Sequence, residues 1–167
     1  MKKFKDKEDY DLMVEKDAYF KNRWGYLSKV ISMMENINPK TILEIGANNF
    51  PLSNYSDTMD LIGNPTYKQS ACEKWNIEKT YDLIIALQVF EHLDNPYLAF
   101  KECINHSNNI LISLPYKWNC PGNCHHMIDE DTIFSWTNIE PFSSSIIDNK
   151  RIINYYKITE IYKKEIK

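Results

Sequence analysis

Two short runs of apolar residues, each followed by a polar turn, stand out along the chain. The first run, 41–45, reads Thr-Ile-Leu-Glu-Ile and passes into a glycine, an alanine and two asparagines. The second run, 81–87, is almost continuously apolar. Both have the length and composition of buried strands in a parallel sheet. Ligands of such sheets bind beyond the carboxyl ends of the strands, so we expect function in the loops 46–49 and 88–92.

Helical and strand-like patterns alternate through the rest of the chain. Apolar side chains at helical spacing between residues 8 and 36 predict one or two amphipathic helices. Asp94-Asn95-Pro96 is a cap-and-proline start for a helix over 95–105. The other predicted elements are a strand at 109–114, a helix capped by Asp129, and strands at 143–147 and 151–158 around the polar turn 148–150.

The connection after Gly46 is shorter than a parallel sheet normally requires. The segment 49–55 is too short and too broken for a full helix. Asp60, on the next predicted strand (58–62), lies 14 residues beyond Gly46, whereas a dinucleotide-binding unit has its acidic residue roughly 20 residues on. Residues 63–80 leave room only for a short edge strand and its loops.

These patterns predict a single α/β domain over residues 1–167. An N-terminal helical segment covers 1–38, and a Rossmann-like core covers 39–160. The core is a mainly parallel sheet with an antiparallel terminal hairpin and helices on both faces. The region between its first and fourth strands is reduced.

The composition narrows the choice of partners. The chain has 167 residues and a net charge of −3, so no diffuse basic field invites nucleic acid or an anionic membrane. No apolar run is long enough to span a membrane, and none follows the N-terminal lysines as a signal peptide requires. The four cysteines are too few and too uneven for a disulfide scaffold. We expect a cytoplasmic protein without nucleic-acid or membrane partners.

Three of these features together resemble the class I S-adenosylmethionine-dependent methyltransferases. The segment 44–48, Glu-Ile-Gly-Ala-Asn, is similar to their first motif, in which a strand with an acidic residue runs into a glycine-rich loop. The segment 87–93, Leu-Gln-Val-Phe-Glu-His-Leu, is similar to the one after their fourth strand. The terminal hairpin matches their last two strands. Asn48 and Phe50 depart from the family, because they stand where the motif usually has its second and third glycines.

The resemblance implies S-adenosylmethionine as the cofactor. In the family the loop 46–48 lets the backbone approach the methionine half, and Gln88 lines the floor beside the sulfonium. Asp60 would bind the ribose hydroxyls, with Asp57 as the alternative, and the pair 70–71 stands where the family has an acid near the adenine amine. The expected cofactor-binding residues are Glu44, Gly46, Ala47, Asn48, Asp60, Leu61, Ser70, Ala71, Gln88 and Val89.

The sulfonium carries an activated methyl group, so catalysis rests mainly on in-line placement of the acceptor. A hydroxyl acceptor gains further from a general base, for which a histidine is suited. The candidates are His92 after the fourth strand, and His125 and His126 in the loop 116–127. On the N-terminal helical segment, Tyr19, Arg23 and Trp24 are candidates to close the site.

The same loop raises a metal alternative. Cys120, Cys124, His125 and His126 are nitrogen and sulfur ligands of the kind that zinc takes. Structural zinc sites usually draw paired ligands from two separate segments, and the sequence has no second pair. We therefore expect no metal.

The sequence thus predicts a small S-adenosylmethionine-dependent methyltransferase with a small-molecule or saccharide acceptor. The alternative is a non-catalytic S-adenosylmethionine-binding or interaction module on the same fold, which the shortened first connection would explain. A nicotinamide oxidoreductase is a weaker alternative, because the chain lacks Gly-x-Gly-x-x-Gly. A homo-oligomer in which a second subunit completes the site also stays open.

Overall fold

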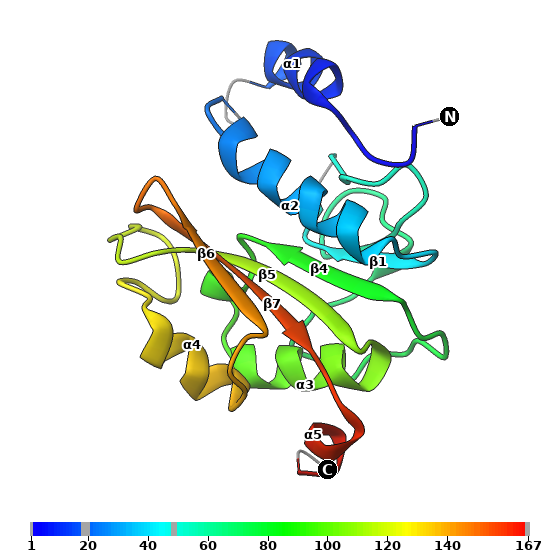
Figure 1. Ribbon diagram of the computed structural model, residues 1–167, viewed down its shortest axis with the longest axis vertical. Helices are drawn as coiled ribbons and strands as arrows, with labels where there is room; N and C mark the ends of the chain where they lie inside the picture. The colour runs from blue at the N-terminus through cyan, green and yellow to red at the C-terminus, as the bar shows by residue number, and fades with distance from the viewer. Residues whose placement is uncertain (1, 18–20, 48–49, 166–167) are drawn as a thin grey trace.

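The computed structural model describes residues 2–17, 21–47 and 50–165, which form a mixed sheet with helices on both faces (Figure 1). The described strands are β1 (Ile42–Ile45), β2 (Asp57–Asp60), β3 (Tyr67–Lys68), β4 (Leu83–Leu87), β5 (Asn109–Pro115), β6 (Ser143–Ile147) and β7 (Arg151–Lys157). The described helices are α1 (Lys7–Lys16), α2 (Trp24–Ile37), α3 (Pro96–His106), α4 (Glu130–Thr137), α5 (Glu160–Glu165) and the 3-10 turn η2 (Phe90–His92).

The strand order confirms the predicted fold class. The described strands lie in the order β3-β2-β1-β4-β5-β7-β6. The first five of these are parallel to one another. β7 runs antiparallel to both β5 and β6. The hairpin turn between β6 and β7 uses Asp148 and Asn149 at positive φ (52° and 51°), a conformation that short polar side chains tolerate.

Two apolar clusters hold the helices to opposite faces of the sheet. On one face, α2 buries Val30 and Met34 against Leu83 and Ile85 of β4. On the other face, α3 and α4 pack against the alternate strand residues, such as Ile84, whose side chains point the other way. The alternate residues of β4 thus enter two different clusters, which is why the strand is apolar without interruption.

The helix starts follow the sequence signals. The Asn95 side chain accepts a hydrogen bond from the backbone N–H of Leu98 at 3.1 Å, and Pro96 occupies the first turn of α3. The Asp129 side chain caps α4 by accepting from the backbone N–H of Thr132 at 2.9 Å. Both caps were predicted from these residues, because capping depends on local chemistry.

The region between β1 and β4 is reduced, as predicted. Its described residues form the four-residue β2 and the two-residue β3 and no α-helix. β2 begins at Asp57 and ends at Asp60, slightly earlier than the predicted strand. Asp57 therefore lies at the amino end of β2, where its carboxylate accepts from Lys79 Nζ and the Tyr81 hydroxyl, both at 2.7 Å. Ligands of such sheets bind at the opposite edge, so this position favours Asp60 over Asp57 for the ribose.

Candidate functional site

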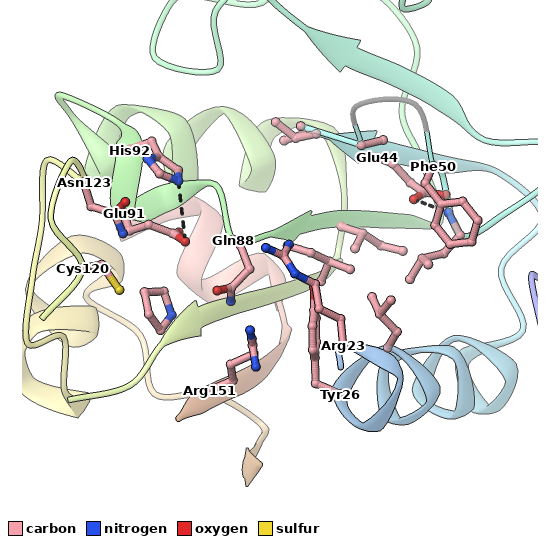
Figure 2. A pocket seen from close by; sticks show the side chains of 18 of the residues that line it. Arg23, Tyr26, Glu44, Phe50, Gln88, Glu91, His92, Cys120, Asn123 and Arg151 are labelled. Atoms are coloured by element: carbon pink, nitrogen blue, oxygen red, sulfur yellow. Dashed lines mark hydrogen bonds and ion pairs between the residues drawn. The ribbon is translucent and has the colours of Figure 1, made fainter. Parts of the chain in front are cut away.

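A pocket of about 470 Å³ opens at the carboxyl ends of β1 and β4. Its walls come from the start of α2, the turns after β1 and β4, the loop after β5 and the first residue of β7. Figure 2 shows the side chains of Arg23, Gln88 and Arg151 pointing into this space, with Glu91 beside it. The pocket therefore lies where the carboxyl ends of neighbouring parallel strands meet.

The turn after β1 fits the backbone approach expected of Gly46. Gly46 has a φ of +65°, which favours glycine, and its N–H donates to the Met59 carbonyl at 2.8 Å. A Cβ atom at this position would lie 2.4 Å from Cγ2 of Val89. Gly46 and Ala47 line the pocket, and Val89 packs directly behind the glycine. A bulkier residue at Gly46 would therefore strain the fold as well as the pocket.

Gln88 ends β4 in an unusual conformation. Its φ is +56°, which is uncommon for a residue other than glycine, asparagine or aspartate. The backbone N–H donates to the Ser113 carbonyl at 2.9 Å, and the side-chain amide donates to the Ser113 hydroxyl at 3.3 Å. These bonds to β5 fix the Gln88 amide at the pocket wall. Backbone strain that the surrounding structure holds in place is typical of binding sites.

Glu91 is a buried carboxyl group at the pocket. Only 2% of the residue is exposed, and its Oε2 atom has no hydrogen-bond partner among the described residues. Its Oε1 lies 3.9 Å from Nε2 of His92. Burial raises the pKa of Glu91 to about 7, although the positive charges of Arg151 and Arg23 oppose the shift. Glu91 can therefore hold or release a proton near neutral pH.

Two arginines bring positive charge to the pocket from distant parts of the chain. Arg23 precedes α2, and Arg151 begins β7. The guanidinium carbon of Arg151 lies 4.8 Å from the centroid of the Tyr26 ring, a cation–π contact. Guanidinium groups bind carboxylates and phosphates well, so the pocket can hold an anion beside the buried acid.

Glu44 differs from Glu91 although both are buried carboxyl groups at the pocket. Its oxygens accept three hydrogen bonds of 2.8 Å, from the backbone N–H groups of Leu52 and Ser53 and from the Ser56 hydroxyl. Burial raises the pKa of Glu44, and these donors oppose the shift. The expected cofactor contact of Glu44 is therefore indirect, since its carboxylate ties the shortened connection to β1.

The residues expected at the adenosine lie outside the described pocket. Asp60 follows the Met59–Gly46 hydrogen bond at the end of β2, so it lies beside the glycine turn. Its Oδ1 accepts from the backbone N–H groups of Leu61 (2.8 Å) and Ile62 (3.2 Å). Leu61 is 63% exposed. Ser70 accepts from the Cys72 N–H, and Ala71 is buried in the core. Asn48 lies outside the described residues, as does Tyr19.

Of the three candidate histidines, only His92 lines the pocket. His125 bonds through Nε2 to the Leu93 carbonyl at 2.9 Å and packs against the Trp136 ring. His126 is exposed, and the neighbouring Asp129 accepts hydrogen bonds from Thr132. The geometry of His125 is that of a group bracing the loop.

The loop 116–127 reaches the pocket through other side chains. Trp118, Cys120 and Asn123 line it. Burial and the charge of Glu91 raise the pKa of the Cys120 thiol, so the thiol is held neutral. No group of three or more histidine, cysteine, aspartate or glutamate side chains among the described residues is arranged to hold a metal ion.

Sequence reasoning placed the pocket but missed some of its residues. The sequence analysis included Glu91 in the segment 87–93 and Arg151 in the strand 151–158, but it assigned neither residue a role in the site. Neither periodicity nor spacing marks them. The nearest signal was a charged residue near an apolar run, since Glu91 lies four residues beyond β4 and Arg151 begins β7.

Comparisons with solved structures identify the fold. A methyltransferase from Clostridium acetobutylicum, described as S-adenosylmethionine-dependent, superposes with a TM-score of 0.59 at 11% identity over 90% of this chain and 98% of that one. The N-methyltransferase NodS from Bradyrhizobium japonicum, solved with S-adenosyl-L-homocysteine (SAH), gives 0.54 at 11% identity over 80% and 87%. The N-terminal domain of EvdMO1, solved in the presence of SAH and D-fucose, gives 0.51 at 12% identity over 79% and 83%.

No family model matches the chain, and no curated protein does. With the strand order described above, the structural matches show that the chain has the class I S-adenosylmethionine-dependent methyltransferase fold. Among the described residues, no helix is both long and apolar enough to cross a membrane.

The chemistry of the pocket fits the methionine half of the cofactor that this fold implies. That half carries a carboxylate, an ammonium and a sulfonium. The guanidinium group of Arg23 complements the carboxylate, and Glu91 complements the positive groups. The glycine turn at Gly46 supplies room for close approach.

Proposed function

We propose that this protein transfers the methyl group of S-adenosylmethionine to a small-molecule or sugar-type acceptor. The observation that carries the proposal is the pocket at the carboxyl ends of β1 and β4. It combines a glycine turn, a strained Gln88 and a buried carboxyl without a described partner on Oε2. The fold supports the same proposal, because the solved neighbours are methyltransferases.

The cofactor would bind across the turns after β1 and β2. Gly46, Ala47 and Gln88 would contact the methionine half, with Val89 behind the glycine. Asp60, beside the glycine turn, would face the ribose side. Leu61, Ser70 and Ala71 remain proposals for the adenine side, and Glu44 would act through the connection that it holds.

When bound, S-adenosylmethionine supplies an activated methyl group. The chain then has two tasks, which are to orient the acceptor and to receive a proton if the acceptor is a hydroxyl. His92, half exposed at the pocket, is positioned to exchange a proton with solvent. Its Nε2 lies 3.9 Å from Oε1 of Glu91, which is close but beyond direct hydrogen-bond distance. His125 and His126 have weaker support as catalytic groups, because neither lines the pocket.

A small acceptor is favoured by the size of the pocket and by its lining. The volume of about 470 Å³ is that of a small-ligand site. Trp118 and Asn123 from the loop after β5 supply the apolar face and the polar group that a sugar requires. The D-fucose present with EvdMO1 is a sugar found with a protein of the same fold. The net charge of −3 disfavours nucleic acid as the acceptor.

One observation favours the alternative, a non-catalytic module. Both Glu44 and Asp60 bond to backbone N–H groups of their own connections. A site whose acidic residues serve the fold holds a cofactor less tightly. The non-catalytic module would bind SAH or a partner without turning over.

Calorimetric titration with S-adenosylmethionine, SAH and NAD tests the proposal. A methyltransferase binds the first two and not NAD. Binding of SAH followed by no methyl transfer to a panel of sugars and small alcohols would favour the non-catalytic module. Tight binding of NAD alone would refute both.

A further inference from the structure

Arg151 lines the pocket from the side away from the glycine turn. It is the first residue of β7 and is in register with Pro115 of β5. The order β1-β4-β5-β7 places three strand spacings between β1 and β7, about 14 Å. Gly46 and Arg151 therefore face the two opposite ends of one pocket.

The guanidinium of Arg151 is held in place but is not neutralised. The Tyr26 ring lies under it at 4.8 Å, and no carboxylate of the described residues lies within 4.0 Å. Its Nε atom is buried and has no hydrogen-bond partner among the described residues. A buried N–H without a partner is costly, so such a group usually meets a ligand or an ordered water.

We propose that Arg151 binds a carboxylate or phosphate group of the methyl acceptor. The identification of this anion as the methyl acceptor rests on the proposed function, whereas anion binding by Arg151 can be tested without it. A guanidinium stacked on an aromatic ring presents its N–H groups in one plane, as the oxygens of a carboxylate or phosphate require. An anionic sugar, such as a uronic acid or a sugar phosphate, combines this group with hydroxyls.

Glu91 gives the proposed site a pH signature. The charged or titratable groups near it are Arg23 before α2, Arg151 on β7, and the neighbouring His92 and Cys120. An anion at Arg151 disfavours the ionised form of Glu91 and favours the protonated form. Binding near pH 7 therefore takes up a proton, and affinity falls as the pH rises above about 7.

The test titrates the full chain with D-glucuronate and with inorganic phosphate, using D-glucose as the neutral control. The parent protein should bind at least one of the two anions more tightly than D-glucose. Arg151→Gln should weaken that binding on the order of tenfold or more. Lys150→Gln, which removes a charge from the adjacent exposed position, should leave it unchanged. Titrations in buffers of different ionisation enthalpy should report proton uptake by the parent.

Several results would overturn the proposal. One is equal anion binding by Arg151→Gln and the parent, and another is a parent that binds neither anion. If Arg151→Gln does not fold, Arg151→Lys keeps the charge without the planar group and should weaken binding less. Loss of SAH affinity with unchanged affinity for 5′-methylthioadenosine, which lacks the carboxylate, would assign Arg151 to the cofactor instead. A parent that binds anions but not SAH would refute the proposed function and leave the anion site standing.

Discussion

The two sides of the pocket use buried polar groups in opposite ways. On the side of β1, the carboxylate of Glu44 accepts hydrogen bonds from the backbone N–H groups of Leu52 and Ser53, in the connection that follows its strand. On the side of β4 and β7, Oε2 of Glu91 and Nε of Arg151 are buried without a described partner. The polar group on the first side has hydrogen-bond partners within the chain, whereas those on the second side can bond to a ligand.

The difference follows from the length of the connections. A full crossover helix would satisfy its own backbone groups, but the connection after β1 is too short to include one. Its N–H groups at Leu52 and Ser53 would be buried without acceptors, and Glu44 supplies them. α3 completes the connection after β4, so no carboxylate is needed there and Glu91 remains available. The shortened connection thus uses the carboxylate of Glu44, which the sequence had placed among the expected cofactor-binding residues.

The largest expected effect is on the side of β1. Glu44→Ala leaves two buried N–H groups without an acceptor, and we expect it to destabilise the fold by on the order of 3 to 5 kcal/mol. Denaturant unfolding at neutral pH measures this change. Glu35→Ala, which removes an exposed carboxylate from α2, is the matched control and should cost little. A small effect of Glu44→Ala would mean that water replaces the carboxylate.

The glycine turn should be the next most sensitive point. Gly46→Ala forces a Cβ to within 2.4 Å of Val89 at a φ of +65°. We expect a loss of on the order of 2 to 4 kcal/mol in unfolding free energy. Adding Val89→Ala should recover the part due to the clash and leave the part due to φ, and a double-mutant cycle separates the two.

Glu91→Gln should increase the unfolding free energy instead of lowering it, and only at higher pH. The folded-state pKa of Glu91 is about 7 and its ordinary value is 4.5, so the folded state holds the proton more tightly. The stability that this proton binding provides is present below about pH 4.5 and is lost as the pH rises through 7. We expect Glu91→Gln to be more stable than the parent by on the order of 2 to 3 kcal/mol near pH 8 and equal to it near pH 4.

Thermal unfolding of both proteins across that pH range measures the difference. Glu73→Gln, an exposed carboxyl, serves as the control and should show no such pH dependence. A pH-independent difference for Glu91→Gln would show that burial does not raise the folded-state pKa of Glu91.

The smallest effect is expected at the end of β2. If Asp60 also accepts hydrogen bonds from the ribose hydroxyls, Asp60→Ala should weaken SAH binding by on the order of 1.5 to 3 kcal/mol. Asp57→Ala is the control, because Asp57 lies at the other end of the same strand and bonds to Lys79 and Tyr81. Calorimetric titration of both variants with SAH measures the change in affinity. Equal SAH affinities of Asp60→Ala and the parent would leave Asp60 with only its role in the turn.

Much of the fold could be predicted from local pattern. The continuous apolar runs gave β1, β4 and β5, the Asp148-Asn149 turn gave the hairpin, and Asn95 and Asp129 gave the starts of α3 and α4. Each signal lies within a few residues of the element that it predicts. The reduced region followed from a count of residues. The strand ends were less certain, since β2 ends two residues before its predicted limit.

The candidate site was predicted only where it coincides with strand ends. Gly46 and Gln88 line the pocket because they follow β1 and β4 directly. The histidines of the loop 116–127 were chosen by type, but the fold turns His125 onto Trp136 and exposes His126. Side-chain direction in an irregular loop has no periodicity, so no pattern in the sequence could have predicted it.

The sequence by itself determined the order of strands and helices, the short first connection and the glycine at its turn, because all of these depend on neighbouring residues. The tertiary structure decided which buried polar groups have hydrogen-bond partners among the described residues and which have none. Glu44 within β1 and Glu91 in the turn after β4 are both buried acids, and only the packing of the chain around them gives one three hydrogen-bond donors and leaves an oxygen of the other without a described partner. Arg23 and Arg151 meet at one pocket although most of the chain separates them, since pairing of β5 with β7 brings distant residues together.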